Sequence, residues 1–335
     1  MHKSKLFISL IAGLGVGLGA LTASAKPLEI RISWAVAPAH LTPLLNVNTS
    51  MYRHYGKSYV IKPMRMRGSG PALQALAAGE TDIGGLSGQA LVLGVTRAKL
   101  DLRVIAQLMT AGFAGYPSSS FWARKGEFKS PKDLKGKRLA VNARGGTVDA
   151  ALRAMLGRYG YRDGPDFQLV EVRFPAMLPA LESKRVDLVY LVLPFNFIAK
   201  KKGGFEPIFA MSDALGPTQT LNWIARASWI KKNRAAVVDF LEDHMRFRAW
   251  AEDPKNRQEM LKVVSKATKR PAKNYAGWVF TKKGYYHAAN AKSDTAMLQK
   301  NIDDLAKLKI LPTTLDVAKH TDQSLTKEAY GRLKR

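Results

Sequence analysis

The chain has 335 residues, 46% of them hydrophobic, no cysteine and a formal charge of +27 at pH 7. The absence of cysteine excludes disulfide bonds, thiolate catalysis, thiolate metal sites and the acylated cysteine of a lipoprotein. Stability must therefore come from hydrophobic burial, for which a chain of this length suffices, and the length favours two lobes or domains.

The first residues have the pattern of a cleaved secretory signal. Lys3 and Lys5 precede an apolar stretch over residues 6–21, and Ala23-Ser24-Ala25 then fits the small-x-small cleavage rule. The apolar stretch is shorter than the ~20 residues that a bilayer span needs, although an uncleaved membrane anchor is the alternative. We expect residues 1–25 to be removed. The mature chain, with a charge of +25 once both lysines are lost, is expected to be a free periplasmic protein.

The positive charge would concentrate anions near the protein, but it could equally attract an acidic membrane surface or serve solubility. Lysine and arginine residues are scattered along the chain rather than gathered in a stripe. The lysine runs at 200–202, 231–232 and 282–283 are expected to be solvated faces. Because the scattered charge and the export signal do not fit nucleic-acid binding, we expect no nucleic-acid partner.

Residues 26–119 alternate predicted strands with predicted helices, which is typical of a lobe built on a parallel sheet. The predicted strands cover residues 28–36, 59–66, 82–86 and 102–109. A first helix is expected to begin at Thr42-Pro43, with Thr42 as its N-cap, and to end at Gly56. A second helix is expected after Gly68, with Ser69 or Gly70 as its N-cap.

Residues 120–220 repeat this alternation and predict a second lobe. Its predicted strands cover residues 120–123, 138–142, 168–172, 186–193 and 205–211, and its predicted helices cover 147–159 and 177–184. A polar connector over residues 212–220 precedes a strand over 221–229 that should return to lobe one. Residues from 231 onward have helical periodicity and are expected to pack on lobe one. Lobe one then comprises residues 26–119 and 221–335, and the two crossings form a hinge.

One phrase occurs in both predicted lobes. Residues 75–83 are echoed by residues 180–188, and the aspartates of the two copies, Asp82 and Asp187, are 105 residues apart. Each copy predicts a helix end followed by a buried strand, which leads into a loop: Ser87-Gly88-Gln89 in the first lobe and Pro194-Phe195-Asn196 in the second. Because ligands of open parallel sheets sit beyond the carboxyl ends of the strands, two such lobes facing one another would form a cleft.

Two glycine-containing loops are candidate anion sites. Gly145-Gly146-Thr147 and Gly68-Ser69-Gly70 each stand between a predicted strand and a predicted helix, where free N–H groups and the helix dipole favour an anion. The alternative is that these glycines serve turn geometry alone. Arg144, beside the first loop, is the charged side chain expected to pair with the anion, with an outward-facing arginine as the alternative.

Other candidate residues offer apolar surface or uncharged polar groups. The aromatic rings that could flank the organic part of a ligand, with ordinary core packing as the alternative, are Trp34, Tyr116 and Phe195. The loop residues that offer hydroxyl and amide groups are Ser87, Gln89, Ser118 and Ser119. His40 lies in a loop near the expected cleft and could contact a ligand, with a lone surface histidine as the alternative.

The sequence lacks the signatures of catalysis and of metal binding. It contains no Gly-x-Ser-x-Gly elbow, no His-Glu-x-x-His, no Walker loop and no Gly-x-Gly-x-x-Gly after a predicted strand. The histidines are isolated in sequence, without cysteines or a close carboxylate cluster. We therefore expect neither an enzyme nor a protein with a cofactor or metal.

These patterns together resemble the substrate-binding proteins of ABC importers for nitrate, aliphatic sulfonates and taurine, a family related to thiamine-pyrimidine-precursor binders. The resemblance covers about residues 28–230. It rests on the repeated phrase, on Asp133-Leu134-Lys135-Gly136-Lys137 followed by a strand and Gly-Gly-Thr, and on the stretch from Ala180 to Pro194. Residues 315–325 also resemble the C-terminal tail of this group.

The resemblance implies an α/β type II periplasmic-binding-protein fold, with two lobes, two hinge crossings and a helical C-terminal extension on lobe one. Ligand would bind in the open cleft, closure would bury it, and a membrane permease would recognise the closed form. The cleft loops carried over by position, together with the candidates above, give these expected ligand-binding residues: Trp34, Ser69, Gly70, Ser87, Gln89, Ser119, Arg144, Gly146, Thr147, Val148, Pro194 and Phe195.

The function expected from the sequence is that of a monomeric periplasmic receptor of an ABC importer. It would capture a small organic anion, sulfonate- or carboxylate-like, and deliver it to the permease. One alternative is a thiamine-pyrimidine-precursor binding protein or a synthase-like enzyme on the same fold. Another is a sensor or structural protein that closes on a ligand and engages a different membrane partner. The sequence does not identify the ligand.

Overall fold

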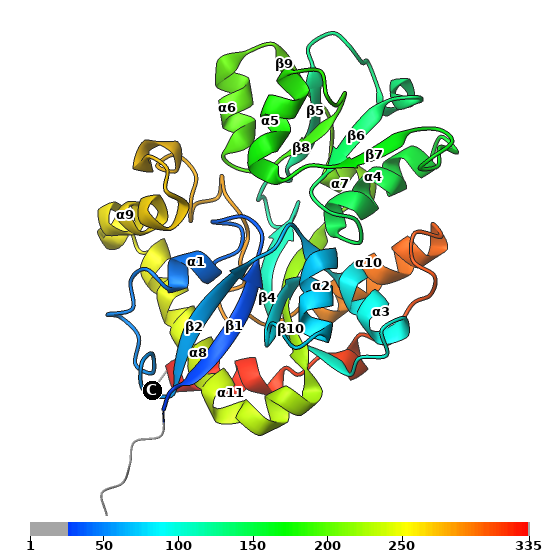
Figure 1. The fold of residues 1–335 in the computed structure, drawn as a ribbon. Coiled ribbons are helices and arrows are strands. Elements are labelled where there is room, and N and C mark those ends of the chain that lie inside the picture. The colour runs from blue at the N-terminus through cyan, green and yellow to red at the C-terminus, as the bar shows by residue number, and fades with distance from the viewer. Residues whose placement is uncertain (1–25, 334–335) are drawn as a thin grey trace, which may run out of the picture.

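A computed structural model describes residues 26–333 as two α/β lobes joined by two crossing segments (Figure 1). The expected signal sequence, residues 1–25, lies outside the described residues. The chain builds the first part of lobe one, crosses to lobe two after β4, and returns with β10. No helix within residues 26–333 combines the length and the apolar character needed to cross a membrane.

Lobe one contains a five-stranded sheet in the order β2-β1-β3-β10-β4. The strands are β1 (Leu28–Trp34), β2 (Tyr59–Arg65), β3 (Ile83–Leu86), β4 (Leu102–Ala111) and β10 (Thr218–Arg226). β1 is parallel to β2 and β3, whereas β10 is antiparallel to β3 and β4. The sheet is therefore mixed, because β10 returns from lobe two. β10 begins at Thr218, within the segment predicted to be a polar connector.

Lobe two repeats this arrangement with shorter strands. They are β5 (Ser120–Arg124), β6 (Arg138–Val141), β7 (Gln168–Glu171), β8 (Val189–Leu191) and β9 (Phe205–Ala210). β5 is antiparallel to β8 and β9, and β6 is parallel to β7. A bridge between Leu139 and Leu188 joins β6 to the segment that enters β8. The resulting order β7-β6-β8-β5-β9 matches that of lobe one, so the two lobes are alike, as the repeated phrase predicts.

The aspartate of the repeated phrase makes the same contact in each lobe. Asp82, just before β3, accepts hydrogen bonds from the main-chain N–H (2.9 Å) and from the guanidinium Nη2 (2.7 Å) of Arg31 on β1. Asp187, just before β8, accepts them from the N–H (2.8 Å) and the Nη2 (3.2 Å) of Arg138 on β6. Each carboxylate therefore ties the strand that follows it to the neighbouring parallel strand.

A second arginine ends the antiparallel strand of each lobe and reaches a helix. Arg226 of β10 donates to the carbonyl oxygen of Leu76 (3.0 Å) in α2 (Ser69–Ala77). Arg124 of β5 donates to the carbonyl oxygen of Leu181 (2.8 Å) in α5 (Phe174–Glu182). Carbonyl groups near a helix C-terminus lack partners within the helix, and these guanidinium groups supply them. The same arginine contact between a strand and a helix therefore occurs in both lobes.

Helices cover both faces of the lobe one sheet (Figure 1). On one face lie α2, α3 (Gly88–Thr96) and α10 (Thr295–Lys307), which share a hydrophobic core with the sheet. On the other face lie α1 (Thr42–Leu45), α8 (Ala227–Glu252), α9 (Arg257–Thr268) and α11 (Ser324–Leu333). The C-terminal helices therefore pack on lobe one, as expected. The helices of lobe two are α4 (Thr147–Gly157), α5, α6 (Phe195–Lys202) and α7 (Met211–Leu215).

The helix predicted to run from Thr42 to Gly56 is wrong in both of its ends. Thr42 is the first helical residue of α1 and not its N-cap, and α1 has only 4 residues. Gly56, with a φ of +79°, lies in the loop before β2. That loop is held from α8, where the Asp243 carboxylate accepts hydrogen bonds from the N–H groups of Arg53 (2.8 Å) and His54 (3.0 Å). This long-range contact has no signal in the local sequence.

The polar loops expected after the repeated phrase are helix starts. Ser87 is the N-cap of α3, and α6 begins at Phe195. Gly68 occupies the cap position of α2, so neither Ser69 nor Gly70 is its N-cap. The Ser69 hydroxyl instead accepts a hydrogen bond from the N–H of Ser87 (3.1 Å), which ties the starts of α2 and α3 together.

Candidate functional site

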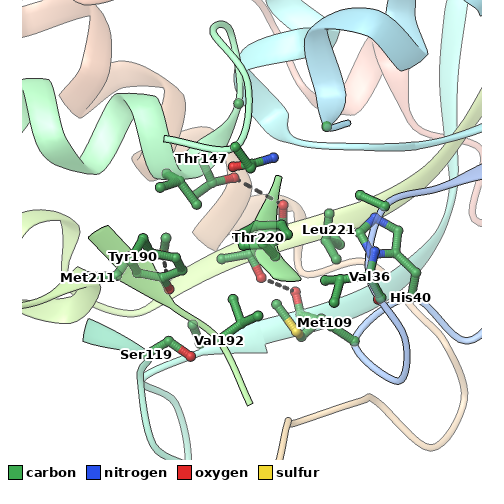
Figure 2. Close-up of a pocket in the computed structure, with 18 of the residues that line it drawn as sticks. Val36, His40, Met109, Ser119, Thr147, Tyr190, Val192, Met211, Thr220 and Leu221 are labelled. Carbon is green, nitrogen blue, oxygen red and sulfur yellow. Dashed lines mark hydrogen bonds between the residues drawn. The ribbon is translucent and has the colours of Figure 1, made fainter. Parts of the chain in front are cut away.

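A cavity lies between the two lobes and beside the crossing segments, and its empty volume, counted together with open solvent at its mouth, is about 670 Å³. Lobe one contributes Val36 and His40 from the loop after β1, and lobe two contributes Thr147 and Tyr190 (Figure 2). The residues at or near the crossings that line it include Met109, Ser119, Thr220 and Leu221. A small molecule bound in this cavity would touch both lobes.

The N-termini of α2 and α4 meet at this cavity from opposite lobes. Ser69 lines it from α2, and Gly146, Thr147 and Val148 line it from α4. Among residues 26–333, no hydrogen bond uses the main-chain N–H groups of these four residues. Free N–H groups at a helix N-terminus, together with the helix dipole, attract an anion or another acceptor group.

Carboxylates of the protein already satisfy the neighbouring N–H groups. The N–H of Gly145 donates to Asp149 Oδ2 (2.9 Å), and the N–H of Arg144 donates to Glu171 Oε1 (2.7 Å). The anion-binding capacity of this loop is therefore confined to its last residues, at the start of α4.

None of the described residues that line the cavity carries a charge at neutral pH. Burial lowers the pKa of His40 to about 4, so its imidazole is neutral, and burial raises the pKa of the Tyr190 phenol. An anion here would be met by helix dipoles, N–H groups and hydroxyls rather than by a cationic side chain. No group of three or more His, Asp and Glu residues in the described part of the chain is placed to hold a metal ion.

Positive charge lies instead outside the cavity. A second hollow shares Pro117, Ser119 and Tyr285 with the cavity wall, and Lys282 and Lys283 line it. The ammonium of Lys282 stands 4.5 Å from the centre of the Tyr116 ring. These lysines place positive charge beside the cavity wall, and such charge attracts anions.

The two lobes touch beside the cavity. Asn142 Nδ2 of lobe two donates to the carbonyl oxygen of Arg67 in lobe one at 2.9 Å. A Cβ atom on Gly68 would lie 2.3 Å from that Nδ2, and a Cβ atom on Gly70 would lie 2.4 Å from the carbonyl oxygen of Arg144. Neither distance is tolerated by a side chain, so these glycines allow the close approach of the lobes. The two lobes are therefore in direct contact beside the cavity.

Hydrogen bonds also connect α4 to the crossing strands. The Thr147 hydroxyl donates to the carbonyl oxygen of Thr220 (3.1 Å), and the Thr220 hydroxyl donates to that of Met109 (3.0 Å) (Figure 2). The start of α4 is thus fixed to β10, and β10 to β4. Thr147 therefore both lines the cavity and joins lobe two to the hinge.

The structure brings five of the residues expected from sequence into the cavity wall: Ser69, Ser119, Gly146, Thr147 and Val148. It places Arg144 outside this wall, half-exposed, with its guanidinium paired to the Asp163 carboxylate. Gly70 lies behind the wall, against the backbone of Arg144.

The other expected residues have local structural contacts. Trp34 lies under the guanidinium of Arg65, whose central carbon is 5.3 Å from the ring centre. Phe195 has a similar contact with Arg270 at 5.1 Å, and Pro194 precedes it at the cap position of α6. Three more expected residues lie elsewhere: Ser87 at the α3 N-cap, Gln89 in two other hollows beside α3, and Ser118 in the second hollow.

Several residues of the cavity wall do not follow from sequence reasoning. Asn142 follows β6 directly, so the rule that ligands lie beyond strand ends could have found it. Tyr285 comes from the irregular segment between α9 and α10, where no periodic pattern gives a signal. Tyr190 lies inside β8, and its direction depends on the register of the sheet.

The chain matches the model of the NMT1-like family over residues 24–265. Among curated proteins, it is 29% identical over 178 residues to the nitrate/nitrite binding protein NrtA of Synechococcus elongatus. That alignment covers 50% of this chain and 40% of the relative, so the chain spans less than half the length of the curated relative that it matches.

Solved structures show the same architecture. The alkanesulfonate-binding protein SsuA of Xanthomonas axonopodis pv. citri, bound to MOPS, superposes with a TM-score of 0.69 at 15% identity, over 89% of this chain and 99% of that one. The periplasmic nitrate-binding protein NrtA of Synechocystis PCC 6803 superposes with a TM-score of 0.73 at 15% identity, over 92% of this chain and 89% of that one. At these identities the likeness shows the fold alone, and it confirms the two-lobe periplasmic-binding-protein fold expected from the sequence.

Proposed function

Because the chain belongs to the NMT1-like family, we propose that it is the solute-binding receptor of an ABC importer. It captures a small organic anion, sulfonate- or carboxylate-like, between its lobes and delivers it to the membrane permease. It acts in the periplasm as a monomer, and the role requires no catalysis. The named relatives, which are binding proteins for nitrate, nitrite and alkanesulfonates, support this proposal.

The observation that carries the proposal is the meeting of two helix N-termini at one cavity between the lobes. Ser69 on α2 and Gly146, Thr147 and Val148 at α4 line one cavity, and their N–H groups have no partner among the described residues. An acidic group placed there would receive hydrogen bonds from both lobes at once. The apolar side chains of the wall, among them Val36 and Met109, would pack against the organic part.

This geometry explains how binding would close the molecule. A ligand shifts the balance between open and closed states only through contacts that are better in the closed state. An anion at the α4 N-terminus alone would favour neither state. When the lobes meet, the same anion also gains the α2 N-terminus and loses water, and both changes favour closure.

One observation favours a second candidate, the capture of a neutral thiamine-pyrimidine precursor. The cavity wall carries no charged side chain, and most of it is apolar, including Phe174, Val192 and Leu221. A neutral heteroaromatic ring with its own hydrogen-bonding groups would meet this wall without the cost of burying a charge.

A thermal-shift screen of the chain from Lys26 onward distinguishes the two candidates. The panel contains aliphatic sulfonates, taurine, aliphatic and aromatic carboxylates, nitrate and neutral pyrimidines. We expect an organic anion to raise the melting temperature, since a ligand at a hundred times its Kd adds about 2.7 kcal/mol to the stability. Stabilisation by a pyrimidine and by no anion would replace the first candidate with the second.

A double variant tests the site within the same screen. Gly146→Val with Thr147→Ala alters the α4 N-terminus, and we expect it to abolish the shift caused by the anion. Gly157→Ala, near the other end of α4, is the control, because a Cβ atom there meets nothing within 4 Å. An unchanged shift in the double variant would exclude the α4 N-terminus from the site.

A further inference from the structure

Asn142 has one polar atom that the protein leaves without a partner. The residue follows β6, is 6% exposed and lines the cavity. Its Nδ2 donates to the carbonyl oxygen of Arg67, across the junction of the lobes. Its Oδ1 is buried and, among the described residues, receives no hydrogen bond. An unpaired buried acceptor costs about 1–3 kcal/mol, so its occurrence in a cavity wall calls for an explanation.

The orientation of this amide is fixed. The carbonyl oxygen of Arg67 can only accept, so Nδ2 must face it and Oδ1 must face away. Gly68 makes the approach possible, since a Cβ atom there would lie 2.3 Å from Nδ2. Turning the amide over would leave two oxygen atoms facing one another. The protein therefore cannot satisfy Oδ1 by a flip of the side chain.

We propose that Asn142 Oδ1 accepts a hydrogen bond from the bound ligand. The ligand is then an organic acid that carries an O–H or N–H donor close to its acidic group, such as a hydroxy acid or an amino- or amide-substituted acid. The proximity follows from the chain, because Asn142 and Gly146 belong to the one loop that leads from β6 to α4. This inference rests on the proposed function and narrows it. Nitrate and unsubstituted alkanesulfonates, which have no such donor at neutral pH, are excluded as preferred ligands.

The same amide couples recognition to closure. Its Nδ2 makes the hydrogen bond that connects lobe two to lobe one, and its Oδ1 accepts the hydrogen bond from the ligand. When the lobes are apart and the contact with Arg67 is absent, a ligand hydrogen-bonded to Oδ1 would hold the amide in the orientation that this contact requires. Asn142 is thus a residue that determines specificity at the point where the lobes meet.

Two matched pairs of small acids test the inference by titration calorimetry. The first pair is 2-hydroxyethanesulfonate and propane-1-sulfonate, and the second is 2-hydroxypropanoate and 2-methylpropanoate. Within each pair a methyl group replaces the hydroxyl at similar volume. We expect the hydroxylated member of at least one pair to bind more tightly by about tenfold or more, because the methyl analogue leaves Oδ1 unpaired.

Two variants separate recognition from closure. Asn142→Leu removes both polar atoms, so we expect weaker binding of both members of the pair and loss of the preference for the hydroxyl. Gly70→Ala disturbs the junction, where its Cβ atom would lie 2.4 Å from the carbonyl oxygen of Arg144, but it keeps Asn142. The Gly70→Ala variant should bind both acids of a pair more weakly but should still prefer the hydroxylated acid. A purely structural role for Asn142 would instead make the two variants behave alike.

Each other outcome overturns the inference. Equal affinity within both pairs, or a preference that survives Asn142→Leu, would show that Oδ1 does not read the ligand. Failure of all four acids to bind would do the same, since the hydroxylated members meet every requirement stated here. The proposed function would still stand if another anion of the thermal-shift panel bound. It would fail separately if no anion of that panel did.

Discussion

His40 combines a position in the cavity wall with an imidazole that is buried and neutral. Burial lowers its pKa from 6.5 to about 4, against the smaller influence of main-chain hydrogen bonds at Val36 and Gly85. Between these two values the unfolded chain binds a proton that the folded chain does not. Stability from this group is therefore complete above pH 6.5 and is lost as the pH falls toward 4.

The effect of His40 on stability can be measured. Each pH unit within that window changes the free energy of unfolding by up to about 1.4 kcal/mol for one such group. His40→Asn should flatten the dependence, because the amide cannot be protonated and can still hydrogen-bond at Val36. Urea unfolding of both proteins at several values between pH 7 and about pH 5 gives the two slopes. His287 and His244, whose pKa values burial also lowers, keep part of the wild-type slope in the variant. Equal slopes in the two proteins would nevertheless contradict the role given to His40.

At the residue scale, sequence reasoning finds the loops better than the side chains. Ser69 and Thr147 follow from helix starts that strand and glycine patterns reveal. Arg144 is the charged candidate from sequence, but Asp163 holds its guanidinium away from the cavity wall, and that carboxylate lies on a different loop. The role of Asn142 follows only from its hydrogen bond to the carbonyl oxygen of Arg67 in the other lobe. The direction of a side chain in a loop depends on partners that are distant in sequence.

At the element scale, the repeated phrase corresponds to two ion-paired contacts with different burial. Asp82 is 5% exposed in its side chain and Asp187 is 14% exposed. Partial burial opposes ionisation of Asp187, but hydrogen bonds from the N–H and guanidinium of Arg138 outweigh it and hold its pKa below the ordinary value. Each carboxylate joins the two parallel strands next to it, so its loss should loosen the centre of its own sheet.

Asp82→Asn and Asp187→Asn should each destabilise the protein in urea unfolding. The variants keep the side-chain volume but lose a charged acceptor of several hydrogen bonds, which is worth about 2–3 kcal/mol at the more buried Asp82 and less at Asp187. Glu29→Gln is the control, because its pair with Lys62 is exposed and should contribute less than about 1 kcal/mol. A loss at Asp82 no larger than that of the control would contradict the role given to the phrase.

Element prediction succeeded where periodicity was regular and failed where tertiary contacts decide. The strands of both lobes and the helices α4, α8 and α10 follow from alternation and helical spacing. The helices α3 and α6 were missed because Ser87-Gly88-Gln89 and Pro194-Phe195-Asn196 look like turns, although such residues also begin helices. The helix predicted after Thr42 stops early because α8 holds the following loop in another conformation.

At the scale of the whole molecule, two glycines permit the contact between the lobes. Gly68 and Gly70 face lobe two at distances that exclude a Cβ atom. Sequence reasoning places both in a loop beside the cleft, since the alternation of elements predicts two lobes. It cannot show that they are needed for contact between the lobes, because that requires the lobes to be placed against one another.

Gly70→Ala should hold the lobes apart without unfolding either of them. We expect a larger radius of gyration in solution scattering and an affinity for the anion that is lower by about tenfold, which corresponds to about 1.4 kcal/mol. The stability of the unliganded protein should change little, because the backbone of Gly70 is in an ordinary helical turn. If this variant has the same scattering curve and the same affinity as the wild-type protein, the contact at Arg144 does not limit closure.

In the proposed mechanism, a ligand is held between the two lobes, and its contacts with both of them close the molecule. Solution X-ray scattering of the chain from Lys26 onward, with and without a saturating anion identified by the thermal-shift screen, tests it most directly. We expect the radius of gyration to fall on binding and the bound curve to agree with an arrangement in which both lobes contact the ligand. Superimposable curves in the presence of demonstrated binding would contradict the claim.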